Sequence, residues 1–252
     1  MDKQAFSEAL ERVLTEGREK NGIGTLGEKT LHAVLKEYYE PFCDNREVKV
    51  GNFVADIVGE NGIIEIQTGN FHRLIKKLDV FLEYCDVTVV YPVASKTRLL
   101  KIDPDTGELC DKRTSPKHMT LYDCAPELYP IRFAFDNPRF HLRLCFLEIE
   151  ETRRLVKKKR GRGKPTVKLD RVPVELVDEM CFDCVADYES FIPQGLSEEF
   201  TCKDFAFCAK TNTGFARMII NILIYLEIAA KIGKDKKGAY IYKIEKQNLK
   251  NL

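Results

Sequence analysis

An aspartate, a glutamate and a glutamine stand among apolar residues in the stretch FVADIVGENGIIEIQTG, residues 53–69. The two apolar runs flank the turn signal Gly59-Glu60-Asn61-Gly62, and this pattern predicts a β-hairpin. Side chains alternate between the faces of a strand, so Glu65 and Gln67 share one face of the second strand. The partner of Asp56 then depends on which residues form the loop.

Two loops of two residues fit the turn signal. A Glu60-Asn61 loop places Asp56 directly opposite Glu65, with the Cβ atoms about 4.5–5.5 Å apart. An Asn61-Gly62 loop, which is the stronger signal, places Asp56 opposite Gln67. Glu65 is then its diagonal neighbour, at about 7–8 Å. Both registers put the three side chains on one face of the sheet.

A divalent cation is the natural partner of two carboxylates at this distance, because the two negative charges otherwise repel each other. Mg²⁺ prefers hard oxygen ligands and usually takes one or two carboxylates together with water and substrate phosphate. The bound ion can lower the pKa of a water and clamp a phosphodiester as it is attacked. The pattern therefore predicts a Mg²⁺ or Mn²⁺ site. The alternative is a pair of surface acids on a half-exposed sheet.

The spacing of Asp56, Glu65 and Gln67 resembles the signature of the PD-(D/E)XK nuclease superfamily, the fold of many restriction endonucleases and Holliday-junction resolvases. That signature is an aspartate on a hairpin strand, then an acid, any residue and usually a lysine on the next strand; here eight residues separate Asp56 from Glu65-Ile66-Gln67. The resemblance covers roughly residues 25–92. It implies a restriction-endonuclease-like mixed sheet flanked by helices, DNA cleavage, and metal ligation by Asp56, Glu65 and the main-chain carbonyl of Ile66.

The chain departs from that signature where the lysine would stand. Lysine would orient the attacking water and stabilise developing charge, whereas the amide of Gln67 can orient water but carries no charge. Ala55 also replaces a proline, at a position that is lax in the family. The family often adds a glutamate from the helix before the hairpin, and Glu28 is the candidate. Alternatively, Thr25-Leu26-Gly27-Glu28 is a capping box that begins that helix.

The remaining apolar periodicity predicts the elements around the hairpin. Helices are expected over residues 2–17, 25–39 and 71–82, a buried strand over 87–92 and a long strand over 141–156. Residues 63–67 and 87–91 should be neighbouring parallel strands, because a helix connects them. We interpret His32 and His72 as packing or surface residues.

The C-terminal part has a different pattern. Helices are expected over residues 172–191, 201–210 and 215–227, followed by a hairpin with the tip GKDKKG. This order is typical of a winged helix-turn-helix. Thr213, Arg217 and Asn221 form a polar stripe on the third helix that could contact base edges, and the tip lysines Lys234, Lys236 and Lys237 could contact phosphate. The alternative is a plain helical bundle, and such domains also form homodimers.

Between these parts lies a basic run, RRLVKKKRGRGKPTVK, with nine Lys or Arg and no acid. Its GRGKP segment is similar to a minor-groove arm, so Arg160 and Arg162 are candidate DNA contacts; the alternative is a solvated linker. We therefore predict a nuclease-like domain over residues 1–156, a basic linker over 157–170, and a smaller winged helix-turn-helix domain over 171–252.

Composition sets the outer limits. Of 252 residues, 44% are hydrophobic and 31% are charged, which is ordinary for a soluble globular protein. A net charge of +1 excludes a global attraction to nucleic acid, and nine scattered cysteines favour free thiols over a disulfide framework. No apolar run is long enough to span a bilayer and no signal peptide precedes the first helix, so we expect a cytoplasmic protein without membrane partners.

Two functions from different classes are compatible with these patterns. The first is a metal-dependent DNA endonuclease with a C-terminal DNA-binding domain. The second is a catalytically inactive DNA-binding or regulatory protein that keeps the nuclease fold as a scaffold. Both imply DNA as the partner, and only the first requires a metal at Asp56 and Glu65.

Overall fold

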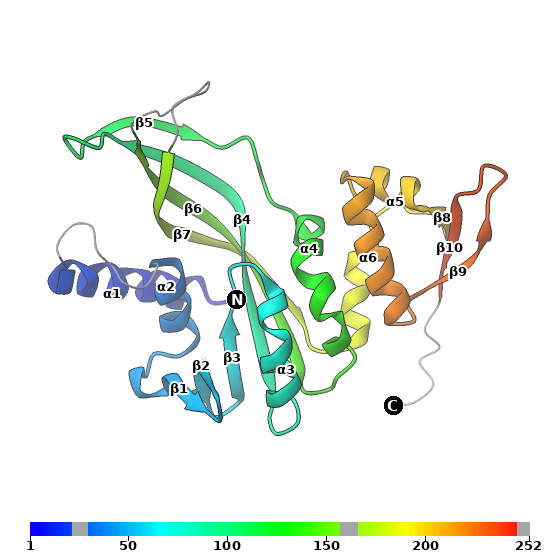
Figure 1. Ribbon diagram of the computed structural model, residues 1–252, viewed down its shortest axis with the longest axis horizontal. Helices are drawn as coiled ribbons and strands as arrows, with labels where there is room; N and C mark the ends of the chain where they lie inside the picture. The colour runs from blue at the N-terminus through cyan, green and yellow to red at the C-terminus, as the bar shows by residue number, and fades with distance from the viewer. Residues whose placement is uncertain (22–29, 157–165, 246–252) are drawn as a thin grey trace. The chain divides into compact units, whose positions relative to one another are not determined.

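The predicted hairpin belongs to a large mixed sheet flanked by helices (Figure 1). The computed structural model describes residues 1–21, 30–156 and 166–245, with the side chains of residues 16–21 left out. The strand order is β1-β2-β3-β4-β6-β7, and β5 pairs with β4. The strands are β1 (Arg46–Val50), β2 (Phe53–Gly59), β3 (Gly62–Ile66), β4 (Val87–Ile102), β5 (Leu109–Thr114), β6 (Phe140–Leu155) and β7 (Thr166–Phe182).

Contacts within the chain divide it into two units. Unit 1 consists of Met1–Thr68, Val90–Met119 and Leu144–Met180. Unit 2 consists of Gly69–Val89, Thr120–Arg143 and Cys181–Leu252. Each unit is built from three separate segments, and the long strands β4, β6 and β7 contribute residues to both.

The core of unit 1 joins two N-terminal helices to the sheet. The helices are α1 (Lys3–Asn21) and α2 (Thr30–Tyr39), and the predicted apolar stripe of α2 is buried. One hydrophobic cluster contains Phe6 from α1, Leu31, Val34 and Leu35 from α2, Ile57 from β2, Ile66 from β3, and residues of β4, β6 and β7. Burying each such side chain stabilises the fold by about 1.5–3 kcal/mol. This core therefore fixes α2 against the strands that carry the candidate site.

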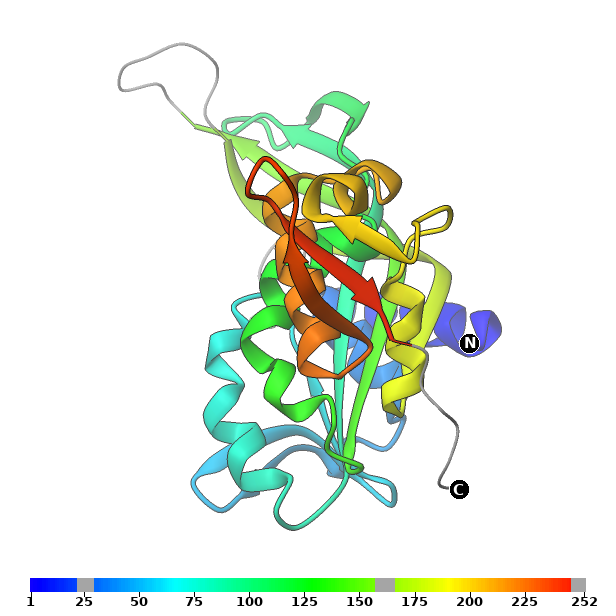
Figure 2. The same cartoon turned by 90° about the vertical axis from the view of Figure 1, so that its right-hand side faces the viewer.

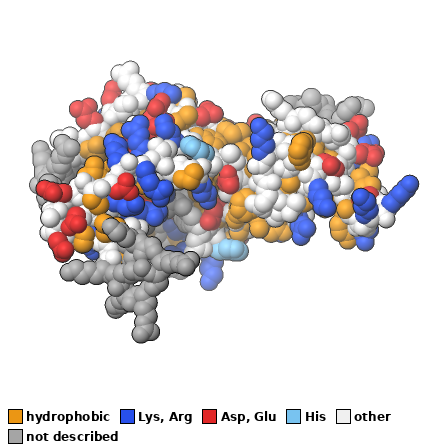
Figure 3. All heavy atoms as spheres, turned by 90° about the horizontal axis from the view of Figure 1, so that it is seen from above, with side chains coloured by type: hydrophobic (Ala, Val, Ile, Leu, Met, Phe, Trp, Pro, Cys, Tyr) orange, Lys and Arg blue, Asp and Glu red, His pale blue; other side chains and the backbone are white. Residues whose placement is uncertain are grey.

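Charged side chains on the long strands β4, β6 and β7 of unit 1 are paired across the sheet. Lys96 Nζ lies 2.7 Å from Glu148 Oε1, and Arg98 contacts both Glu148 and Glu150. The buried carboxylate of Glu151 accepts from Arg153 and also pairs with Lys168 and Arg171. Figure 3 shows Lys and Arg side chains gathered close to Asp and Glu on this part of the surface. These basic groups therefore have carboxylates as close neighbours.

Unit 2 has a core of aromatic rings and an apolar helix. The rings of Phe135 and Tyr188 stack with centroids 4.8 Å apart, and Phe182 packs against both Tyr188 and Phe191. The helices are α3 (Ile75–Phe81), α4 (Ala125–Leu128), α5 (Cys202–Cys208) and α6 (Thr213–Tyr225). Ile219, Ile220 and Leu223 of α6 are buried, so one face of this helix is core.

A second, three-stranded sheet completes unit 2. Its strands β8 (Glu199–Thr201), β9 (Ala229–Lys234) and β10 (Tyr240–Ile244) have the spatial order β8-β10-β9. The β9–β10 hairpin directly follows α6, and Figure 2 shows it beside that helix. At the hairpin tip Asp235 Oδ1 accepts from the main-chain N–H groups of Lys237 and Ala239, each at 2.8 Å. These bonds hold the turn in which the predicted tip lysines lie.

The helix predicted over residues 172–191 is wrong. Residues up to Phe182 form strand β7, and Val185–Phe191 forms a short 3-10 helix. Apolar Val172, Val174 and Leu176 alternate with other residues, as a strand requires. Pro173 lacks an N–H donor, and β7 tolerates it because it is the last strand in the order of the sheet.

The boundaries between the two units do not fall at the predicted linker, residues 157–170. Residues 166–170, placed in the linker, begin β7, and β7 residues up to Met180 belong to unit 1. Residues 69–89 and 120–143, placed in the first predicted domain, belong to unit 2. The rest of the basic run, residues 157–165, lies outside the described residues, and Arg160 and Arg162 with it.

All nine cysteines are free thiols, as the odd, scattered count predicted. Cys124 and Cys145 are buried, and burial raises the pKa of the Cys124 thiol well above its ordinary value. Within the described ranges, no helix combines the length and apolar character that crossing a membrane requires.

The core of unit 1 predicts a sharp contrast between two positions on β2. Ile57 is 0% exposed and Val54 is 53% exposed. Ile57→Ala should lower the free energy of unfolding by about 2–5 kcal/mol, because it leaves a cavity in the core. Val54→Ala should change it by less than about 0.5 kcal/mol. Urea denaturation of both variants measures the difference, and equal losses would mean that Ile57 is not part of a packed core.

Candidate functional site

The β2–β3 hairpin has the register in which Asp56 and Glu65 face each other. The strands pair Ile57 with Ile64, Val58 with Ile63 and Gly59 with Gly62, so Glu60-Asn61 is the loop. Continuing this register by one residue places Asp56 opposite Glu65, on the same face of the sheet. The Asn61-Gly62 loop, although the stronger turn signal, is wrong. Gly62 instead adopts a φ of 99°, a conformation that glycine reaches without strain.

The carboxylate of Asp56 is bound to the main chain of the neighbouring strand. Its Oδ2 atom accepts a hydrogen bond from the N–H of Ile66 at 2.8 Å. The bond fixes the Asp56 side chain next to the end of β3, where Ile66 is 3% exposed. It also brings the carboxylate close to the peptide group that carries the Ile66 carbonyl.

His32 of α2 meets both of these groups. Its Nε2 atom lies 3.0 Å from the carbonyl oxygen of Ile66 and 3.3 Å from Asp56 Oδ2. A carbonyl oxygen only accepts, so the first contact requires a proton on Nε2. Because one nitrogen contacts both oxygens, the carboxylate of Asp56 and the carbonyl of Ile66 lie close together, with His32 Nε2 between them.

Exposure differs among the residues of this cluster. The side chains of Asp56 and His32 are 21% and 23% exposed, whereas Glu65 is only 2% exposed. A buried carboxylate is stable only with a compensating partner, so Glu65 is held in a polar environment inside the sheet. Gln67 is half-buried, and its main-chain N–H donates to the carbonyl of Val90 at 2.9 Å. That bond confirms that the end of β3 neighbours β4.

His32, interpreted from the sequence as a packing or surface residue, packs against polar atoms of the hairpin. It contacts two of the groups that the sequence assigned to the site. The signal was available, because His32 follows Glu28 by four residues and lies on the helix face from which Glu28 was chosen. Glu28 itself, with the capping box Thr25-Leu26-Gly27-Glu28, lies outside the described residues. The interpretation of His72 as a packing or surface residue stays a prediction.

The predicted metal ligands Asp56, Glu65 and Ile66 lie near one another at the end of the hairpin. Among the described residues, no three His, Cys, Asp or Glu side chains lie together as a metal site. The structure does bring together two oxygens, Oδ2 of Asp56 and the carbonyl oxygen of Ile66, which both contact His32 Nε2. Glu65 lies across the hairpin from Asp56. Mg²⁺ commonly takes as few as one or two carboxylates and completes its shell with water and substrate phosphate. The donors present are therefore of the kind that Mg²⁺ or Mn²⁺ accepts.

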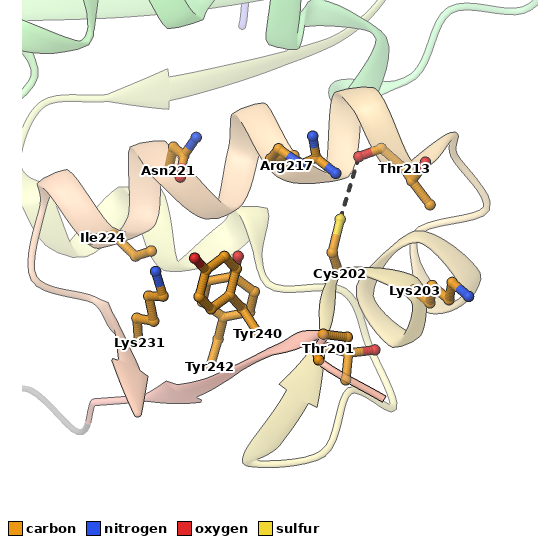
Figure 4. Close-up of a pocket in the computed structure, with 12 residues that line it drawn as sticks. Thr201, Cys202, Lys203, Thr213, Arg217, Asn221, Ile224, Lys231, Tyr240 and Tyr242 are labelled. Atoms are coloured by element: carbon orange, nitrogen blue, oxygen red, sulfur yellow. Dashed lines mark hydrogen bonds between the residues drawn. The ribbon is translucent and has the colours of Figure 1, made fainter. Parts of the chain in front are cut away.

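The predicted polar stripe of α6 does form one surface. Thr213, Arg217 and Asn221 line a pocket of about 590 Å³ between α6, the start of α5 and the β9–β10 hairpin (Figure 4). Cys202 Sγ lies 3.3 Å from the carbonyl of Thr213. Burial raises the pKa of the Cys202 thiol, and the nearby guanidinium of Arg217 partly opposes that shift. The predicted tip lysines Lys234, Lys236 and Lys237 are exposed and do not line this pocket.

Comparison with known proteins identifies a family without an assigned function. Residues 29–183 match a domain of unknown function, DUF8091, and the chain belongs to this family. The chain is also 30% identical over 193 residues to an uncharacterized protein of Treponema pallidum (strain Nichols). The aligned region covers 76% of this chain and 75% of that protein. No solved structure matches. The family match includes His32, Asp56, Glu65 and Gln67 and ends before α5 and α6.

The bond between Asp56 and Ile66 predicts a local effect on hydrogen exchange. Asp56→Ala removes the acceptor of the Ile66 N–H, at a cost of about 1–3 kcal/mol, whereas Asp56→Asn keeps an oxygen in place. The Ile66 amide should therefore exchange faster in the alanine variant than in the asparagine variant. NMR hydrogen exchange measures both rates, with the Gln67 amide, which binds Val90, as the internal reference. Unchanged protection of Ile66 in Asp56→Ala would contradict the contact.

Proposed function

We propose that this protein is a metal-dependent DNA endonuclease that hydrolyses phosphodiester bonds and carries a DNA-binding region in its C-terminal part. One observation carries the proposal. The Asp56 carboxylate and the Ile66 carbonyl lie close together, both in contact with His32 Nε2, and the β2–β3 register, continued by one residue, places Glu65 opposite Asp56 on the same face of the sheet. These are the positions that the resemblance to the PD-(D/E)XK superfamily assigns to metal ligands.

In this proposal Asp56, Glu65 and the carbonyl of Ile66 hold Mg²⁺ or Mn²⁺. The ion would supply an acidified water and charge stabilisation for the attacked phosphate. Asp56 is kept in place by the Ile66 N–H, and His32 lies against both donors as a positioning residue. Gln67 follows on the same strand face as Glu65, and its amide can orient a water by hydrogen bonds without adding charge. Glu28 is retained as a candidate fourth residue.

The order of elements in unit 2 supports the DNA-binding part of the proposal. A short strand, two helices and a hairpin follow one another as β8, α5, α6, β9 and β10, with the sheet order β8-β10-β9. This is the order of a winged helix, in which the second helix of the helix-turn-helix contacts DNA. Here α6 takes that position, with Thr213, Arg217 and Asn221 on its polar side. Lys234, Lys236 and Lys237 would then contact phosphate from the wing.

A second candidate is a DNA-binding regulator that uses the same fold without catalysis. Two observations favour it: Gln67 replaces the lysine of the nuclease signature, and three metal-ligating side chains do not cluster among the described residues. This candidate keeps the DNA contacts of α6 and the hairpin. It differs from the first candidate only in the absence of metal-dependent cleavage. A homodimer formed through the C-terminal part is a third role for α6, in place of DNA contact.

Cleavage assays on the full chain test the nuclease proposal. The wild type should nick plasmid, branched or single-stranded DNA in Mg²⁺ or Mn²⁺ and lose this activity in a chelator. Glu65→Gln and Asp56→Asn should each lower the rate by about 100-fold or more, because the metal loses a charged ligand. Gln67→Lys should preserve or raise activity, since it restores a positive charge at that place.

Two outcomes would contradict this mechanism. Cleavage that survives in Glu65→Gln would point to a contaminant or to another site. Binding of DNA without any cleavage by the wild type or by Gln67→Lys would favour the regulator. Calorimetry with Mn²⁺ on the wild type and on Asp56→Asn reports the metal site without relying on activity, and equal affinities would reject the site.

The salt dependence of DNA binding tests the wing. Each lysine that neutralises a phosphate contributes about 0.9 to the slope of log K against log salt. Changing Lys234, Lys236 and Lys237 to glutamine should therefore flatten the slope by up to about 2.7. Lys49→Gln, on exposed strand β1 of unit 1, is the control and should leave the slope unchanged. Equal slopes in all proteins would remove the wing from the DNA interface.

A further inference from the structure

The pocket beside α6 has walls of regular structure. Its volume is about 590 Å³, within the range of about 300–1,000 Å³ that is typical of small-ligand sites. α6 contributes one helix face, from Thr213 to Ile224, and the β9–β10 hairpin contributes the facing wall. Tyr242 on β10 is 7% exposed and packs against the ring of Phe200. A pocket with such walls keeps its shape without a ligand.

The charge around this pocket has one sign. Lys203, Arg217 and Lys231 line it, and no Asp or Glu does. None of these three cations makes an ion pair with a carboxylate of the described residues. The nearby ammonium group of Lys231, and to a lesser extent that of Lys234, lowers the pKa of the Tyr240 hydroxyl. Unpaired cations around a concave surface attract anions.

Arg217 lies at one side of the pocket, whereas the cation Lys231 lies with the aromatic groups at the other side. In the view of Figure 4, Arg217 lies near Cys202 and Lys203 extends from α5 on the other side of Cys202, whereas Ile224 and the two tyrosines lie toward the other end of α6. Lys231 Nζ covers the ring of Tyr240, 3.2 Å from its centroid. Asn221 lies on α6 between Arg217 and Ile224 and offers both a donor and an acceptor. The pocket therefore pairs an anion-binding end with an aromatic, hydrogen-bonding end.

We propose that this pocket binds one nucleotide unit, with the phosphate on Arg217 and the base against Ile224, Tyr240 and Tyr242. A planar guanidinium binds phosphate through two parallel hydrogen bonds, and aromatic side chains bind bases of any sequence by stacking. Asn221 provides the amide that can pair with the edge of the base. Inorganic phosphate alone would use only one end of the site.

The nucleotide unit has two sources, a free nucleotide or the phosphorylated end of a DNA strand. The strand source rests on the proposed DNA function, whereas the free source does not. Calorimetry on the full chain distinguishes them with three probes: a deoxynucleoside 5′-monophosphate, inorganic phosphate, and a short single-stranded oligonucleotide with and without a 5′-phosphate. These measurements need no cleavage, so their result is independent of the nuclease proposal.

The proposal predicts a specific order of affinities. The monophosphate should bind more tightly than inorganic phosphate, and Arg217→Gln should weaken it about tenfold or more, because a charged hydrogen-bond donor is lost. Tyr240→Ala should weaken the monophosphate but not inorganic phosphate. Lys210→Gln removes one exposed charge outside the pocket and should have no effect. A preference for the 5′-phosphorylated oligonucleotide would assign the strand end as the source, and a preference for the free monophosphate would assign the nucleotide.

Two results would overturn the proposal. One is the absence of binding by both the monophosphate and the phosphorylated oligonucleotide. The other is binding that Arg217→Gln and Lys210→Gln weaken equally, which would reduce the effect to general charge. Arg217 and Tyr240 are exposed, so their variants should keep the wild-type fold, and thermal unfolding of each variant verifies this.

Discussion

The two-residue loop Glu60-Asn61 is the constraint on which the candidate site depends. It fixes which residue of β2 lies opposite Glu65, and therefore whether the two acids are direct or diagonal neighbours. Burial alone does not decide between the two registers. They differ by a shift of two residues, and a shift of two keeps every side chain on its face of the sheet. The difference is made by specific contacts, above all by the bond from the Ile66 N–H to Asp56.

That bond also explains how an acid is tolerated in an apolar strand. Burying an ionised carboxylate without partners is costly, and a hydrogen bond from a main-chain N–H offsets part of the cost. Asp56 obtains this bond, and a contact with His32, at a place where its side chain is still 21% exposed. Its more deeply buried neighbour Glu65 lies across the hairpin. Asp56 is thus the more accessible of the two acids.

Local patterns predicted much of the fold. The stripe of Leu31, Val34 and Leu35 predicted a helix packed on the sheet, and the alternation in residues 141–156 predicted the long strand β6. The parity of Asp56 and Glu65 could be predicted because it depends only on the strand period. The bounds predicted for the third helix and the hairpin of the C-terminal part also lie close to those of α6, β9 and β10.

What the sequence did not predict depends on contacts between distant segments. Residues 172–182 have polar and apolar positions compatible with a helix or a strand, and their pairing with β6 decides the outcome. The contact of His32 with Ile66 joins residues 34 positions apart, so only the packing of α2 against β3 reveals it. The division into units has the same origin, because each unit gathers three separated segments.

Charge pairing distinguishes the two basic surfaces of the chain. On the long strands β4, β6 and β7 of unit 1, Lys96, Arg98 and Lys168 meet Glu148, Glu150 and Glu151, so an anion would have to displace existing partners. Around the pocket of unit 2, Lys203, Arg217 and Lys231 have no described carboxylate as a partner. Net charge does not express this difference, since it is only +1 for the whole chain. An anionic ligand gains more binding free energy where the cations have no carboxylate partner that it must displace. This condition favours the pocket beside α6 over the larger basic surface of the sheet.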